Sequence, residues 1–177
     1  MTNKDLLHII AQKFKVKNGY GISRTKLIKL AYLAEVFYKR QVGDRLTESK
    51  WVFWKYGPYL IEYPAILNSD AFVITTTDDD FQPVKPAEEY SPLFTGIDEE
   101  LAISKAMEFA DDDLNDLLDF VYFDTEPMMH VSQRGEELNF DCVKPEEAYK
   151  IVKYSVSERV KQDIRKKIRK WRERRSE

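Results

Sequence analysis

The stretch that decides the fold is "KLIKLAYLAEVFYKRQVGDRLTESKWVFWKYGPYL", residues 26–60, in which a strong helical pattern leads into an aromatic run around one Gly-Pro step. Apolar residues in its first half recur at helical spacing and form one broad stripe, with others on both flanks. Such a wide apolar arc is typical of a helix that is buried on most sides. The pattern therefore predicts a central helix, capped by Ser23 or Thr25 and ended by Gly43.

The aromatic run "WVFWKYGPYL" occupies residues 51–60. Successive side chains of a strand point to opposite faces, and neither face here alternates cleanly with polar residues, so we expect both faces to be covered. Pro58 fixes its own φ and keeps Gly57 out of the helical region, so the chain is redirected there from an extended segment. Two interpretations stay open: a turn that packs into the core, or a contact surface formed by Trp54, Tyr56 and Tyr59, since Trp and Tyr are enriched at binding hot spots.

Other elements are expected on both sides of this stretch. Residues 71–80 are rich in β-branched side chains, which predicts a strand, whereas the three prolines of residues 81–96 predict a loop. Pro64 is expected to interrupt a short helix, and residues 128–143 to be irregular with a short extended piece. Apolar spacing and caps predict further helices over residues 3–16 (with Asn3 as cap), 98–110, 111–127, 145–154 and 155–177. The predicted fold is mostly α: a compact multi-helix single domain with a small β element and a charged C-terminal helix.

The C-terminal segment combines basic charge with a narrow apolar stripe. Residues 153–177 hold 11 Lys and Arg against 4 Asp and Glu, whereas residues 78–126 hold 16 Asp and Glu against 2 Lys. Three interpretations stay open for this helix: it docks on the domain, it binds a partner's groove, or it contacts nucleic acid. The stripe consists of Val156, Val160, Ile164, Ile168 and Trp171.

The sequence contains no catalytic or metal-binding constellation. His8 lies among apolar helix residues, and His130 has no His or Cys at the spacing of a zinc site. The acidic run at residues 111–113 lacks the glycine and the spacing of a calcium loop, and no Gly-rich phosphate loop is found. A hydrolase that pairs His130 with Cys142 is the third-ranked hypothesis. We therefore expect a protein that is not an enzyme and that needs no cofactor and no metal.

The compartment is predicted from the cysteine content and from the start of the chain. A single cysteine cannot form an internal disulfide, which is typical of a reducing compartment. The first residues lack the uninterrupted apolar stretch of a signal peptide, and no apolar run approaches the ~20 residues of a membrane span. We expect a cytoplasmic protein that does not contact a membrane.

The quoted stretch resembles the core of the Panacea domain, the SocA-like antitoxin family. The shared features are the Lys-Leu-x-Lys-Leu helix (Lys26, Leu27, Lys29, Leu30) followed by Tyr32, a Leu-Thr pair at residues 46–47, and the aromatic run that ends in Tyr56, Gly57 and Pro58. Residues 117–127 and 134–141 are similar to that family's closing helix and tail, so the likeness spans about residues 5–141. We accordingly divide the chain into a Panacea-like (SocA-like) antitoxin domain, residues 1–155, and a basic amphipathic C-terminal helix, residues 156–177.

The resemblance implies a non-enzymatic module that binds and neutralises a toxin encoded beside it. Related domains occur in phage-associated proteins, and one subgroup is similar to a proteolytic adaptor that delivers its toxin to a protease. The resemblance makes Leu27, Leu30, Tyr32, Gly57 and Pro58 framework residues of the fold. The candidate partner-binding residues are Trp54, Tyr56, Tyr59, Lys26 and Trp171. The alternative function is a nucleic-acid-binding regulator, transcriptional or phage-associated, that uses the basic C-terminal helix; the oligomeric state stays open.

Overall fold

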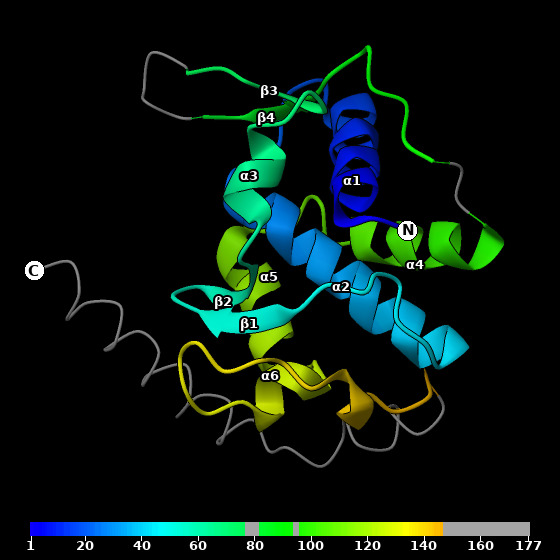
Figure 1. Ribbon diagram of the computed structural model, residues 1–177. Helices are drawn as coiled ribbons and strands as arrows, with labels where there is room; N and C mark the ends of the chain where they lie inside the picture. The colour runs from blue at the N-terminus through cyan, green and yellow to red at the C-terminus, as the bar shows by residue number, and fades with distance from the viewer. Residues whose placement is uncertain (77–81, 94–95, 147–177) are drawn as a thin grey trace, which may run out of the picture.

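The computed structural model describes residues 1–76, 82–93 and 96–146, and its central element is the long helix α2, Arg24–Val42. This helix crosses the middle of the molecule (Figure 1) and packs against α1 (Asn3–Asn18), α4 (Ile97–Met107) and α5 (Leu114–Phe123). Its predicted cap is confirmed: Ser23 Oγ accepts a hydrogen bond from the Lys26 amide at 3.2 Å. The helix ends at Gly43, as its sequence predicts.

Helix α1 begins one residue earlier than the sequence indicates. The prediction of Asn3 as its cap is wrong, because Thr2 Oγ1 accepts the hydrogen bond from the Asp5 amide at 3.2 Å. Asn3 instead lies in the first turn, buried, and its side-chain amide donates to Glu62 Oε1 at 2.9 Å. The Asn3 side chain, which the local sequence pattern assigns to the cap, is thus bound to Glu62, a residue far away in sequence.

The aromatic run forms a β-hairpin. Strand β1 (Trp51–Trp54) pairs antiparallel with β2 (Gly57–Leu60), so that Trp51 lies opposite Leu60 and Trp54 opposite Gly57. Gly57 has a φ of 91°, which redirects the chain at the predicted step. The outer edge of β1 is covered by the predicted extended piece: the Phe53 amide donates to the Glu136 carbonyl at 2.8 Å and the Leu138 amide to the Trp51 carbonyl at 2.8 Å.

Three expectations about the shorter elements are wrong. Pro64 does not interrupt a helix but lies in the first turn of α3 (Tyr63–Leu67), where a missing amide and a fixed φ are favourable. The proline-rich segment contains β4 (Val84–Pro86), which pairs with β3 (Phe72–Ile74) and exchanges two hydrogen bonds with Ile22. Residues 131–139 are irregular as predicted, but the prediction is wrong at both ends of that segment, which lie in α6 (Glu126–His130) and in the 3-10 turn η1 (Phe140–Cys142).

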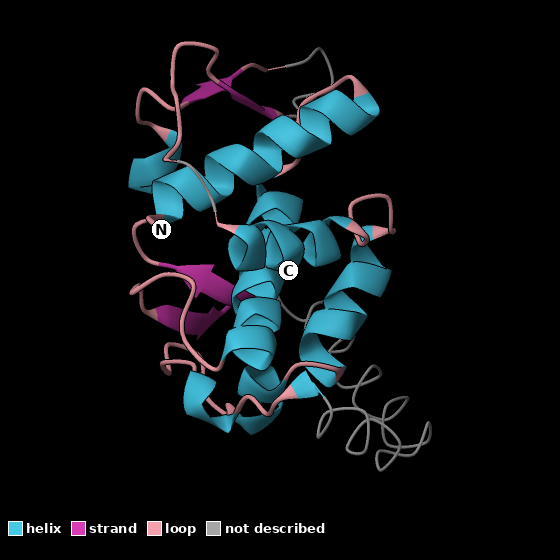
Figure 2. Ribbon diagram, turned by 90° about the vertical axis from the view of Figure 1, so that its right-hand side faces the viewer, coloured by secondary structure: helices cyan, strands magenta, loops and turns pink. Residues whose placement is uncertain are grey.

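Figure 2 shows that helices make up most of the molecule and that the strands form two separate small sheets; apolar side chains from these elements form the core. Tyr32 is fully buried, with its ring edge-on to Trp51 and its hydroxyl 2.9 Å from Thr125 Oγ1. Thr125 donates its only hydroxyl proton to the Val121 carbonyl, so Tyr32 is the donor in that pair. The described residues confirm a mostly helical fold with small β elements. The predicted helices beyond residue 146, and the boundary at residues 155–156, lie outside them.

Candidate partner-binding site

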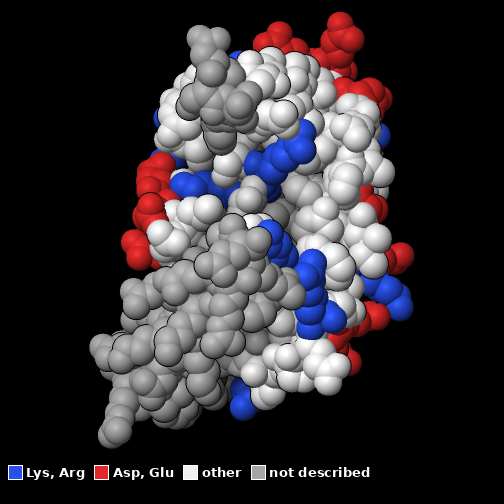
Figure 3. All heavy atoms as spheres, turned by 90° about the vertical axis from the view of Figure 1, so that its left-hand side faces the viewer, with Lys and Arg blue, Asp and Glu red and all other residues white. Residues whose placement is uncertain are grey.

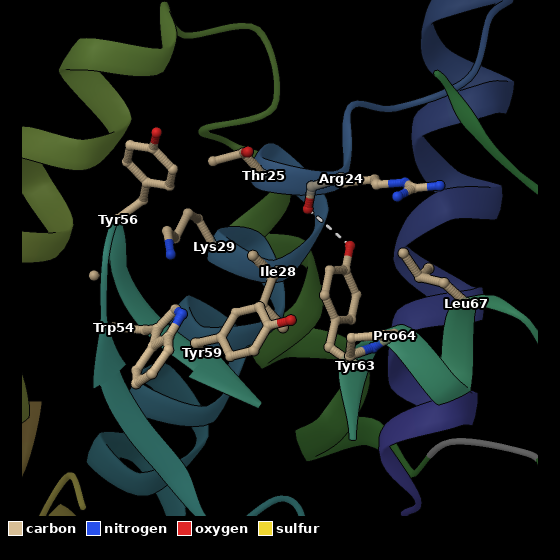
Figure 4. Close-up of a pocket in the computed structure, with 11 residues that line it drawn as sticks. Arg24, Thr25, Ile28, Lys29, Trp54, Tyr56, Tyr59, Tyr63, Pro64 and Leu67 are labelled. Carbon is tan, nitrogen blue, oxygen red and sulfur yellow. Dashed lines mark hydrogen bonds between the residues drawn. The ribbon is translucent and has the colours of Figure 1, made fainter. Parts of the chain in front are cut away.

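A pocket of about 200 Å³ opens between the hairpin, the first turns of α2, and α3. The hairpin supplies one wall of aromatic rings, and the two helices supply the floor and the opposite wall (Figure 4). Three of the predicted partner-binding residues, Trp54, Tyr56 and Tyr59, meet here. The full lining is Arg24, Thr25, Ile28, Lys29, Trp54, Tyr56, Gly57, Tyr59, Tyr63, Pro64 and Leu67.

The rings at the rim of this pocket are accessible to a partner. Trp54 is 43% exposed and Tyr56 is 45% exposed, whereas Trp51 on the same strand is 1% exposed. The Arg134 guanidinium carbon lies 4.2 Å from the centroid of the Trp54 ring. Such a cation over a ring holds the indole in place without covering its other face. The expectation that both strand faces are covered therefore fails at Trp54 and Tyr56.

Lys29 also lines the pocket, although its sequence context indicated only that it belongs to the Lys-Leu-x-Lys-Leu helix. Its side chain is 2% exposed, and its ammonium donates to the Pro58 carbonyl at 2.7 Å. In Figure 4 the ammonium points between Tyr56 and Trp54. Burial lowers the pKa of Lys29 to about 7, because removal from water disfavours the charged form. The sequence does hold an indication of this burial: Lys29 lies between Ile28 and Leu30, within the broad apolar arc of the central helix.

The far wall of the pocket is held by tyrosines. The Tyr63 hydroxyl donates to the Arg24 carbonyl at 2.7 Å, which ties α3 to the start of α2. The rings of Tyr59 and Tyr63 meet edge to face with centroids 6.0 Å apart. Burial raises the pKa of both tyrosines, so both are neutral at physiological pH. The Tyr63–Arg24 hydrogen bond and the Tyr59–Tyr63 ring contact thus hold α2, α3 and the hairpin together around the pocket.

Of the other two predicted partner-binding residues, the structure describes only Lys26. Lys26 is half-buried, and its ammonium donates to the carbonyls of Ala110 and Asp112, at 2.9 and 2.7 Å. These bonds tie the start of α2 to the loop before α5, so Lys26 has a structural role and is not part of the pocket lining. Trp171 lies outside the described residues. Binding of a partner by either residue stays a prediction.

The framework residues of the family motif lie in the interior. Leu27, Leu30 and Tyr32 have no exposed surface, and Pro58 is buried in the hairpin. The Leu-Thr pair that follows α2 also has a structural explanation: the amides of Leu46 and Thr47 donate to the buried Glu35 carboxylate at 3.2 and 3.1 Å. This clamp fixes the loop that leads from the central helix into the hairpin. The full set of predicted framework residues is Leu27, Leu30, Tyr32, Gly57 and Pro58, with Gly57 at the hairpin turn.

Cys142 and His8 make structural contacts in the described part of the chain. Burial raises the pKa of the Cys142 thiol, and its Sγ donates to the Asn139 carbonyl at 2.9 Å, which is the opposite of an activated nucleophile. His8 is a core residue, with its ring Nε2 3.1 Å from the Ala87 carbonyl oxygen. Within residues 1–76, 82–93 and 96–146, no group of three or more His, Cys, Asp or Glu residues is placed to hold a metal ion. The helices of that same part are all too short or too polar to cross a membrane.

Basic and acidic side chains occupy different parts of the surface. On the face that carries the hairpin turn and α3, Lys and Arg side chains gather along the middle, while Asp and Glu lie at the margins (Figure 3). Arg24 and Lys29 line the pocket itself. An approaching partner therefore meets aromatic rings and positive charge together at this site.

Comparison with known proteins identifies the family. The family model described as "Antitoxin SocA-like, Panacea domain" matches residues 27–130, which is more than half of the 177 residues. The matched range contains the hairpin, α3 and most of α2, and therefore most of the pocket lining. Neither the curated proteins nor the solved structures include a match to this chain. The chain belongs to the Panacea-domain family of SocA-like antitoxins.

Proposed function

We propose that this protein is an antitoxin that neutralises a cognate protein toxin by direct contact, with the pocket between the hairpin, α2 and α3 as the contact surface. The observation that carries the proposal is the family match over residues 27–130, because antitoxins of this family are named for that role. The pocket supports the choice of surface, since it lies almost wholly within the matched range.

The chemistry of the pocket suits protein recognition. Interfaces draw most of their binding energy from a few Trp, Tyr and Arg side chains that sit in well-packed surroundings. Trp54 and Tyr56 are exposed on a rigid hairpin, with Tyr59 behind them and Arg134 over the indole. Rings held in this way lose little conformational freedom on binding, which favours affinity.

The proposal is tested by expressing the chain together with the small protein encoded beside it. We expect the neighbour alone to arrest growth, the pair to grow normally, and the two proteins to co-purify. Growth arrest that persists in the presence of the chain, without co-purification, would contradict the proposal. A growing culture in which the toxin is absent from the complex would indicate regulation of the toxin's synthesis instead.

Direct inhibition and delivery to a protease both use the same contact, and they differ in the fate of the toxin. An inhibitor leaves the toxin's half-life unchanged or longer, because the complex accumulates. A proteolytic adaptor shortens the half-life, because each contact ends in degradation. A chase experiment after blocking translation, with and without the chain, separates the two modes.

A further inference from the structure

One polar group at the pocket has hydrogen-bonding capacity that the protein does not use. The Lys29 ammonium carries three donors. Over the described part of the chain it donates one hydrogen bond, to the Pro58 carbonyl at 2.7 Å. The side chain is 2% exposed, and its ammonium points between the rings of Tyr56 and Trp54 (Figure 4). A buried ammonium with unused donors is costly unless an acceptor reaches it, so the site favours the arrival of one.

The charges around the pocket have one sign. Of the eleven lining residues, Arg24 and Lys29 are basic and none is Asp or Glu. Two more cations lie beside the hairpin rings: the Arg134 guanidinium carbon is 4.2 Å from the Trp54 centroid, and the Lys55 ammonium is 5.1 Å from the Tyr56 centroid. An anionic group at this pocket therefore meets positive charge and no lining carboxylate, which is electrostatic complementarity to an acid.

The walls of the pocket are largely aromatic and aliphatic, so we expect its ligand to be apolar except at the charged end. A carboxylate on a flexible stem of methylenes meets both requirements. Lys29 lies behind rings that are themselves more than two-fifths exposed, so the longer stem of Glu reaches it better than the shorter stem of Asp. We infer that the pocket receives a glutamate side chain of the toxin, with its carboxylate on the Lys29 ammonium and its methylenes against Trp54 and Tyr59. This inference rests on the proposed function, which supplies the toxin as partner.

The first test uses the full chain and two small probes of the same shape. N-acetyl-glutamate amide carries the charge, and N-acetyl-glutamine amide replaces the carboxylate by a neutral amide. We expect the glutamate probe to shift the Trp54 indole N–H resonance saturably, with an affinity about ten-fold or more above that of the glutamine probe. A Trp54→Phe spectrum assigns the resonance. Equal shifts from the two probes, or no saturable shift from the glutamate probe, overturn the inference.

The second test removes the ammonium. Lys29→Met keeps the length of the side chain and loses its charge, and Lys50→Met removes the same charge from an exposed site, where the Lys50 ammonium lies 3.2 Å from the Glu137 carboxylate. We expect Lys29→Met to lose the response to the glutamate probe and to bind the toxin about ten-fold or more weakly, with Lys50→Met within about two-fold of wild type. The probe comparison on the wild-type chain stands even if Lys29→Met folds poorly.

The outcomes separate this inference from the proposed function. If the wild-type chain neutralises the toxin, while Lys29→Met binds it equally well, the glutamate inference fails and the antitoxin proposal stands. If the glutamate probe binds in a Lys29-dependent way but no toxin is neutralised, the glutamate-binding pocket stands and the antitoxin proposal fails.

Discussion

Trp51 and Trp54 stand at the two ends of one four-residue strand and have opposite surroundings. Trp51 is 1% exposed and packs against Tyr32, whereas Trp54 is 43% exposed at the pocket rim. Replacing Trp51 by Ala should lower the free energy of unfolding by about 3–5 kcal/mol, because it leaves a large cavity. Trp54→Ala should cost about 1 kcal/mol, mainly from the lost contact with Arg134. Urea unfolding of the two variants measures both values, and equal losses would contradict the contact-surface role of Trp54.

Lys29 gives the fold a distinctive pH dependence. Its pKa is about 7 in the folded chain against an ordinary value of 10.5, so the unfolded chain binds more protons between these values. The free energy of unfolding should therefore rise with pH above 7, by at most about 1.4 kcal/mol per pH unit, while below pH 7 the contribution stays constant. Urea unfolding between pH 7 and 9 measures the rise.

The matched variants for this prediction are the two used for the pocket. Lys29→Met should lose the rise between pH 7 and 9, and Lys50→Met should keep it, because the Lys50 side chain is exposed and leaves Lys29 in place. Parallel curves for wild type and Lys29→Met would show that the Lys29 ammonium is not held in a buried, water-poor site.

At the scale of elements, the hairpin turn sets the position of the aromatic wall. Gly57 has a φ of 91°, and a Cβ added there would lie 3.4 Å from the Tyr122 ring. That distance is an ordinary van der Waals contact, so the positive φ alone is costly, and Gly57→Ala should destabilise the chain by about 1–3 kcal/mol through backbone strain. Gly135→Ala is the matched comparison, since Gly135 has a φ of 90° and open space around its Cβ position, and its loss should be similar. Thermal unfolding of both variants measures the two losses, and an unchanged stability of Gly57→Ala would contradict a strained turn.

The sequence predicts long elements well and short ones poorly. Helices α1, α2, α4 and α5 follow from apolar spacing, because each has enough turns to display a stripe. Strand β4 has three residues with a proline at its end. Besides pairing with β3, it exchanges two backbone hydrogen bonds with Ile22, which is far away in sequence. Local pattern cannot reveal such a pairing. The role of Asn3 is also decided by a tertiary contact, its hydrogen bond to Glu62. The role of Pro64 depends on where α3 begins, since a proline is favourable in the first turn of a helix.

The candidate site was predicted in part. The aromatic composition of residues 51–60 points to Trp54, Tyr56 and Tyr59, and these three do line one pocket. The opposite wall comes from α2 and α3, and its place depends on the Tyr63–Arg24 hydrogen bond at 2.7 Å, which no local pattern shows. Lys29 was missed as a site residue because its burial beside the hairpin is a property of the fold, not of its neighbours in sequence.

At the scale of the whole molecule, the predicted C-terminal helix lies beyond the family match. That match ends at residue 130, and among the described residues the pocket lining ends at Leu67. Deletion of residues 156–177 should therefore leave toxin neutralisation intact in the growth assay. The alternative regulatory function predicts that the same deletion abolishes retardation of DNA or RNA, together with its steep dependence on salt. Loss of neutralisation on deletion would move the toxin contact, or part of it, to the C-terminal segment.

The central claim is that toxin is bound through the exposed rings of the hairpin pocket. The most direct measurement is the affinity of purified toxin for wild-type chain and for Trp54→Ala, with folding of the variant verified by its urea midpoint. We predict at least a ten-fold loss of affinity, about 1.4 kcal/mol or more, in a variant that remains folded and no longer rescues growth. Unchanged affinity in a folded Trp54→Ala chain would contradict the claim and place the toxin contact on another surface.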